Sequence, residues 1–223
     1  MCWNESEEEF TAEESLVRMC TRDLDRLEKK GISIRFARSV VTCNQRLNEA
    51  ASRGISRFDI DLHSMERLIL DARKKGSSDL FATCGKVGGI GYYSEKFGPL
   101  AGYLHVVLAE ERAKSEYRFP GVGEIAFVQD ADEKNLLVGL ASLIGKWVRD
   151  AMMLRIVRHF RARHPELPLA SGYHDPVTAR FIDATKLVRK KESISPKCFL
   201  RENAAPKKAT PKKATSSTHH PPR

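Results

Sequence analysis

The sequence predicts an α/β fold between residues 11 and 200. Segments with apolar residues every three or four positions, typical of amphipathic helices, are interleaved with short β-branched segments that alternate apolar and polar side chains. The chain has 223 residues, of which 41% are hydrophobic and 30% charged, a composition typical of a folded domain. No segment offers the roughly 18 to 20 apolar residues that a membrane span needs. We therefore expect one domain with a mixed sheet, flanking helices and a C-terminal helical segment.

Both ends of the chain are predicted to be disordered. Residues 1–10 are acidic and lack the basic start and apolar core of a signal peptide. Residues 201–223 are rich in Pro, Lys, Ala and Thr, which cannot bury enough apolar surface to fold. This basic tail either binds phosphates or is only a solubilising segment. The five cysteines are widely spaced, so we expect reduced thiols and a cytoplasmic protein without a zinc site.

The first half of the domain opens with a helix. Thr11 and Glu14 have the spacing of a capping box, and the apolar stripe that follows should end at Gly31. The segments after it are a half-buried strand at 32–41, a helix at 59–75 and a short strand at 80–83.

The second half opens with a glycine-rich stretch, residues 85–102. Its spacing fits neither a GxGxxG fingerprint nor a GxxxxGK[ST] loop, which favours a flexible surface loop over a nucleotide site. The segments after it are three strands between 103 and 130 with turns near 110–114 and 120–121, a helix at 133–164, and a helix at 177–189 that Asp175 and Pro176 open.

Charge is distributed unevenly along the chain. Residues 1–139 are slightly acidic, whereas residues 140–200 hold 12 lysines and arginines against five acidic residues. A basic C-terminal third indicates a polyanionic partner, most simply nucleic acid, because Lys and Arg displace the counterions of phosphates.

Two carboxylates stand out as candidate site residues. Asp130 and Asp132 lie two positions apart where a predicted strand ends, which is a usual place for a metal or ligand in an open α/β sheet. The alternative is that Asp132 only caps the following helix. Cys84 ends the other short strand and could lie near Asp132 if the strands are parallel. A buried structural thiol is favoured over a nucleophile, because nothing in the sequence places His63, His105 or His174 beside it.

The run LASLIGKWVRD, from Leu140 to Asp150, resembles the ribonuclease HII family, whose helix reads much like AASIxAKxxRD. Asp132 lies 18 residues before Asp150, where that family has a catalytic aspartate. Weaker matches follow the same order along residues 12–200: Leu47-Asn48 with IDxxNIL, Phe81 to Gly85 with a strand ending in Asp-Gly, Ser171-Gly172-Tyr173 and Thr178 with KGYxT, and Cys198-Phe199 with HRRSF. The resemblance implies a ribonuclease H-like sheet and a tyrosine, Tyr173, that touches the substrate sugar.

The departures from that family concern the metal site. No Asp-Glu strand precedes the first helix, Cys84 replaces an aspartate, and residues 85–123 form an insertion. Two-metal hydrolysis needs several carboxylates around cations about 4 Å apart. Asp132 and Asp130 would be the catalytic and metal-binding residues, with magnesium or manganese if the protein is active and no cofactor otherwise. The sheet should also lack strands, so either the chain is part of a longer protein or the insertion fills the sheet.

We therefore expect a ribonuclease HII-like domain that binds an RNA–DNA hybrid or DNA without a complete metal site. The basic residues predicted to contact phosphates are Lys146, Arg149, Arg155, Arg158, Arg189, Lys190 and Lys191. One alternative is an active ribonuclease on RNA–DNA hybrids, with carboxylates supplied by an absent segment or a partner. Another is a non-catalytic domain whose sheet edge pairs with a protein partner.

Overall fold

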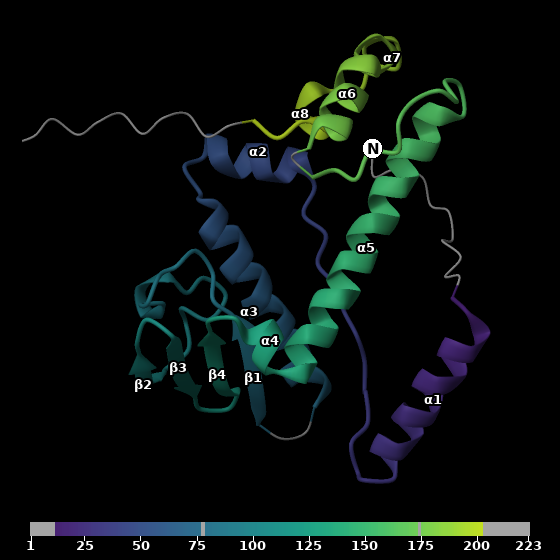
Figure 1. The fold of residues 1–223 in the computed structure, drawn as a ribbon. Coiled ribbons are helices and arrows are strands. Elements are labelled where there is room, and N and C mark those ends of the chain that lie inside the picture. The colour runs from purple at the N-terminus through teal and green to yellow at the C-terminus, as the bar shows by residue number, and fades with distance from the viewer. Residues whose placement is uncertain (1–11, 77–78, 174, 203–223) are drawn as a thin grey trace, which may run out of the picture.

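The fold comes from a computed structural model that describes residues 12–76, 79–173 and 175–202 (Figure 1). The predictions of disorder for residues 1–10 and for the tail beyond Glu202 lie outside these ranges. None of the helices described is long and apolar enough to span a bilayer.

A four-stranded mixed sheet in the order β1-β4-β3-β2 forms one end of the molecule (Figure 1). The strands are β1 (Leu80–Gly85), β2 (Val106–Glu110), β3 (Lys114–Phe119) and β4 (Gly123–Val128). β1 runs parallel to β4, and the other two pairings are antiparallel. The predicted α/β class and the three strands after residue 103 are confirmed. Residues 85–123, which the resemblance implied to be an insertion, contain β2 and β3 and so extend the sheet beyond β4, whereas β1 is an edge strand among the residues described.

The helix α3 (Arg57–Lys75) covers one face of the sheet. It begins two residues earlier than predicted because Ser56 caps it: the Asp59 amide donates to the Ser56 hydroxyl, and the Ser56 amide donates to the Asp59 carboxylate. Leu62 and Ile69 pack against the inward-facing side chains of β3 and β4. This contact forms the larger of two apolar cores.

The glycine-rich stretch 85–102 is not a loosely attached surface loop, as the sequence suggested. Tyr93 and Leu100 are fully buried in the core beneath α3, and the short 3-10 helix η1 (Ser94–Lys96) lies between them. Glu66 of α3 holds this segment, because its buried carboxylate accepts hydrogen bonds from the amides of Gly98 and Leu100. Burial raises the pKa of Glu66, and these two amide donors act in the opposite direction.

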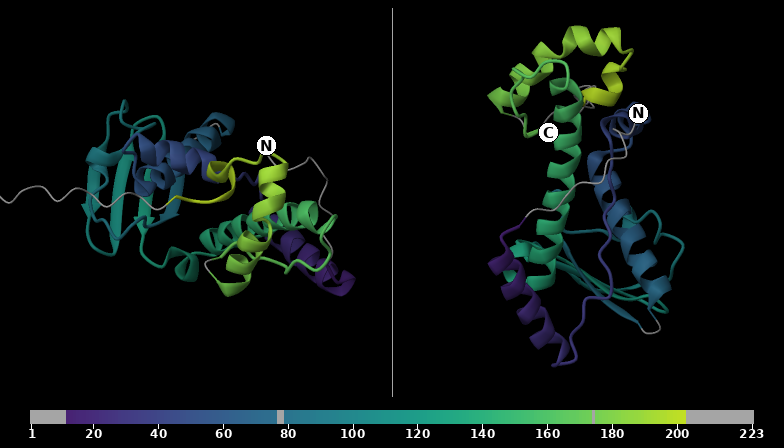
Figure 2. Two further views of the ribbon diagram at one scale, coloured as in Figure 1. Left: turned by 90° about the horizontal axis from the view of Figure 1, so that it is seen from above. Right: turned by 90° about the vertical axis from the view of Figure 1, so that its right-hand side faces the viewer.

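The predicted helix 133–164 is broken at Asn135. α4 (Ala131–Lys134) ends there, and α5 (Leu136–Arg161) begins with the Asn135 side chain accepting from the amides of Leu137 and Val138. α5 runs from the sheet to the opposite end of the molecule, where a second core forms (Figure 2). The helices at that end are α2 (Asn44–Ser52), α6 (Pro176–Ala184), α7 (Lys186–Lys191) and α8 (Pro196–Phe199).

The prediction of a strand at 32–41 is wrong. This segment is irregular, and its apolar side chains Ile32, Ile34 and Val41 are largely exposed. The helix before it, α1 (Glu14–Glu28), forms as predicted but starts after Glu13, without a side-chain cap and with none of its side chains buried. Alternation of apolar residues specifies a strand only where a neighbouring strand is present, and in the described part of the chain this segment pairs with no strand but contacts α3, where Arg38 pairs with Asp71.

Candidate nucleic-acid interface

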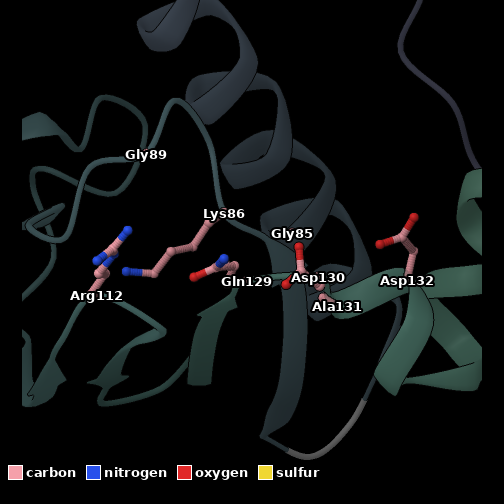
Figure 3. A pocket seen from close by; sticks show the side chains of 8 residues that line it. All are labelled: Gly85, Lys86, Gly89, Arg112, Gln129, Asp130, Ala131 and Asp132. Atoms are coloured by element: carbon pink, nitrogen blue, oxygen red, sulfur yellow. The ribbon is translucent and has the colours of Figure 1, made fainter.

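Asp130 and Asp132 lie at the carboxyl ends of the two parallel strands, as the sequence indicated. Together with Gly85 they line an open pocket of about 470 Å³ (Figure 3). β1 and β4 end at the same edge because Gly85 pairs with Val128, so the residues following both strands meet there. Asp130 adopts a left-handed backbone conformation, with φ of 52°, that turns the chain sharply out of the sheet.

These carboxylates are not helix caps. Asp130 occupies the N-cap position of α4 but makes no side-chain capping bond, and its carboxylate lies 3.8 Å from Lys134 Nζ. Asp132 is exposed in the first turn. Within the described ranges, no three His, Cys, Asp or Glu side chains are grouped so that they could hold a metal ion. Two carboxylates do not fit a two-metal magnesium or manganese centre.

Cys84 does not add a nucleophile to the pocket. Burial raises the pKa of its thiol to about 12, so the sulfur is protonated at neutral pH. The candidate basic partners are engaged elsewhere: His63 Nε2 lies 3.1 Å from the Lys96 carbonyl oxygen, and the His105 ring packs on Phe97. His174 lies outside the described residues.

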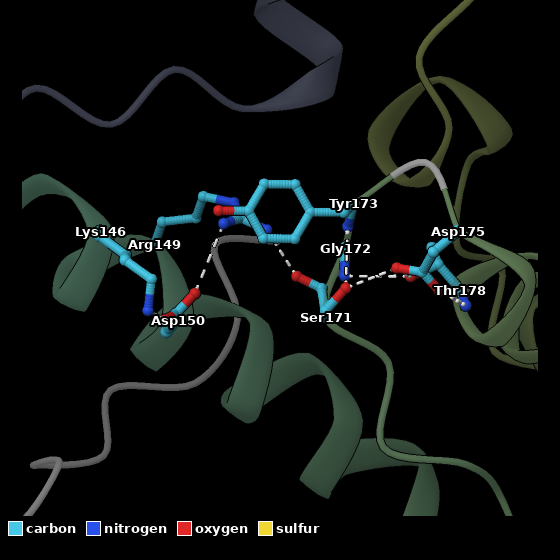
Figure 4. A network of polar contacts seen from close by, with 8 residues as sticks. All are labelled: Lys146, Arg149, Asp150, Ser171, Gly172, Tyr173, Asp175 and Thr178. Carbon is cyan, nitrogen blue, oxygen red and sulfur yellow. Dashed lines mark hydrogen bonds and ion pairs between the residues drawn. The ribbon is translucent and has the colours of Figure 1, made fainter.

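A second group of predicted residues meets on the middle of α5. The guanidinium of Arg149 lies 3.4 Å from the centre of the Tyr173 ring, and one of its nitrogens donates to the Ser171 carbonyl at 2.7 Å (Figure 4). Tyr173 is nevertheless 55% exposed. An exposed aromatic ring beside a guanidinium is suited to stacking with a base or a sugar.

The loop that carries Tyr173 is held by hydrogen bonds to the start of α6. The Ser171 hydroxyl donates to the Asp175 carboxylate, which also caps α6 by accepting from the Thr178 amide. The Gly172 amide donates to the Thr178 hydroxyl. Gly172 has a φ of 74°, and a Cβ there would lie 2.5 Å from Met153 Sδ, so only glycine fits. These hydrogen bonds join the backbone before Tyr173 to the start of α6.

Of the other residues predicted to contact phosphates, some are exposed and one is buried. Lys146 is exposed and pairs with Asp150, and Lys190 and Lys191 are exposed on α7. Arg189 requires a correction, because it is only 7% exposed, donates to the Ile182 carbonyl and stacks on Phe199. Its guanidinium is a structural part of the second core. The remaining two, Arg155 and Arg158, lie on α5 and engage other groups of the protein.

Sequence reasoning missed two cations of the pocket, Lys86 and Arg112. They come from the glycine-rich stretch and the β2–β3 turn, and only the folded sheet brings these together. Neither a family model, nor a curated protein, nor a solved structure matches this chain.

Proposed function

We propose that this chain is a nucleic-acid-binding domain of the ribonuclease HII type that does not hydrolyse its ligand on its own. The observation that carries the proposal is the contact of Arg149 with the exposed ring of Tyr173. Arginine contributes a charge for the phosphate backbone, and the tyrosine contributes a stacking surface. Lys190 and Lys191, exposed on α7, supply further positive charge on the surface of the protein.

A second observation supports the ribonuclease H-like part of the proposal. Two of the segments that carry the resemblance, at Asn48 and at Cys198-Phe199, are joined in space. The Asn48 side chain donates to the carbonyls of Lys197 and Leu200 and accepts from the Glu202 amide, at 2.8 to 2.9 Å. Few side chains can replace a buried asparagine that bonds three backbone groups. The occurrence of such an asparagine within a motif that resembles the family therefore favours a common architecture.

The expectation of no hydrolysis follows from the carboxylates. Asp130 and Asp132 provide at most two acidic ligands, and the position of a third is occupied by a protonated thiol, Cys84. Cleavage of RNA–DNA hybrids by this chain would require further carboxylates from a partner or another segment.

The test is binding and cleavage of a fluorescein-labelled RNA–DNA hybrid, followed by fluorescence anisotropy and gel electrophoresis with magnesium and then with manganese. We expect binding that weakens with salt, since each neutralised phosphate contributes about −0.9 to the slope of log K against log salt. Arg149→Gln should bind more weakly than Arg46→Gln, which removes one charge from an exposed position on α2. Hybrid cleavage that Asp132→Asn abolishes would overturn the inactive assignment, and absence of binding would overturn the nucleic-acid assignment.

A second candidate function is pairing of the β1 edge with an extended segment of a protein partner. Phe81 on this strand is 84% exposed, and α5 contacts β1 with Leu136, Leu137 and Leu143 exposed on its first half. Exposed apolar side chains grouped beside an unpaired strand edge are typical of a protein interface.

A further inference from the structure

The pocket at the ends of β1 and β4 has a cationic half that the sequence did not reveal. In Figure 3 the side chains of Lys86, Arg112 and Gln129 point toward one another, on the side away from Asp132. Lys86 Nζ donates to the Glu111 carbonyl at 2.6 Å, which fixes the amine against the β2–β3 turn. The amine also lies 5.9 Å from the centre of the Tyr93 ring, and among the described residues it makes no other hydrogen bond, which leaves two of its three donors for a ligand.

Arg112 sits at the tip of the same turn. It is exposed and makes no hydrogen bond or ion pair within residues 12–76, 79–173 and 175–202. The turn itself is rigid, because the Glu111 amide donates to the Lys114 carbonyl and the Gln129 amide donates to the Ala113 carbonyl. The guanidinium therefore projects from a fixed base and carries an unneutralised charge over the pocket.

The backbone on the other wall of the pocket is also open to a ligand. Gly89 lines this wall with a positive φ of 67°, and a Cβ built on it would meet nothing within 4 Å. A glycine in this conformation lets a ligand approach the main chain closely. Burial lowers the pKa of Lys86, which is the shift expected of an amine partly removed from water with no carboxylate beside it.

We propose that Lys86, Arg112 and the Gly89 backbone form a binding subsite for a phosphate group. Arginine and lysine donors that converge without a carboxylate between them match the charge and hydrogen-bonding capacity of a phosphate. Asp130 and Asp132 occupy the opposite half of the pocket and orient the ligand, because they repel its anionic end. The phosphate comes either from a polynucleotide strand, in which case the subsite extends the proposed nucleic-acid interface, or from a free polyphosphate.

The test measures acetylation of Lys86 in the full chain by a water-soluble acetylating reagent, quantified by peptide mass spectrometry. Reactions contain inorganic pyrophosphate, a short DNA oligonucleotide, or chloride at matched ionic strength. Lys29, exposed after α1, reports on the reagent itself. We expect both phosphate probes to slow acetylation of Lys86 several-fold without affecting Lys29, and we expect this protection to be lost in Arg112→Gln and kept in Arg46→Gln. The thermal shift produced by pyrophosphate in the same three proteins gives a second readout that does not depend on lysine reactivity.

Each outcome decides a separate point. Protection by pyrophosphate alone, in a chain that does not bind the oligonucleotide, supports the subsite with a free polyphosphate as ligand and counts against the proposed function. Protection by the oligonucleotide alone supports a phosphodiester ligand. If neither probe slows the reaction or shifts the melting temperature, or if Arg112→Gln behaves as Arg46→Gln does, the subsite is overturned while salt-dependent hybrid binding remains a test of the proposed function.

Discussion

Tyr173 is held in place by neighbours but leaves more than half of its surface to solvent, which is unusual for a ring so tightly positioned. Replacing it with alanine should weaken hybrid binding by about 1 to 3 kcal/mol, the usual contribution of one base stacked on an aromatic ring. Tyr173→Phe should retain most of the affinity because the ring remains. Fluorescence anisotropy of the labelled hybrid measures both variants, and equal affinities for the alanine and phenylalanine variants would show that the ring does not stack.

Asp175 connects this loop to stability at low pH. The hydrogen bond from Ser171, and then that from the Thr178 amide, hold the pKa of Asp175 below its usual value. The ionised carboxylate therefore stabilises the fold above the unfolded-state pKa of about 3.9, and this contribution is lost as the pH falls through the lower folded-state pKa. Asparagine caps helices equally well but does not titrate. We expect the melting temperature of Asp175→Asn to fall less than that of the unchanged protein between neutral pH and pH 3, and parallel melting curves across this range would contradict the assignment.

At the scale of elements, the attachment of the 85–102 segment to α3 depends on one carboxylate. The amides of Gly98 and Leu100 both donate to the same oxygen, Oε2, so Glu66→Leu, which removes the carboxylate, leaves both amides without an acceptor in the core. An unsatisfied buried polar group costs about 1 to 3 kcal/mol. Urea unfolding should show that loss for Glu66→Leu and almost none for Glu28→Leu, which changes an exposed residue of α1.

Elements with local signals were predictable, and those that depend on distant partners were not. Asp175 and Pro176 and the turn at Gly121 carry their signals within a few residues, and α3 has an apolar stripe along its own length, so α3, the start of α6 and the β3–β4 hairpin were found. The segment 32–41 has strand periodicity, yet no strand lies beside it in the described part of the chain. The helix α2 was missed because the two interactions that define it, at Asn44 and Asn48, reach residues about 150 positions away.

The difference between local and distant signals also explains which residues of the pocket could be predicted. Asp130 and Asp132 were identified because a strand and its end can be read locally. Lys86 and Arg112 come from different segments, and their approach follows from the sheet order, which no local pattern specifies.

At the scale of the whole molecule, apolar side chains that are exposed to solvent should make the protein associate with itself or with a partner. Phe81 on β1 is 84% exposed, and Leu136, Leu137 and Leu143 on the first half of α5 are also largely exposed. Phe81→Asp should lower the weight-average mass measured by light scattering at high protein concentration. The matched control is Leu187→Asp, an equally exposed residue on α7, which should leave the mass unchanged. An equal effect of the two substitutions would indicate nonspecific hydrophobic association and not an interface at β1.

The length of α5 sets a distance between the two parts of the proposed interface. Thirteen residues separate Leu136, at the start of the helix near Asp132, from Arg149, and at 1.5 Å per residue they span about 20 Å. A nucleic-acid strand advances about 3.4 Å per nucleotide, so about six nucleotides cover this distance. Oligonucleotides shorter than that can occupy the pocket or the tyrosine but not both, and affinity should therefore rise steeply at a threshold length instead of increasing smoothly with each added nucleotide.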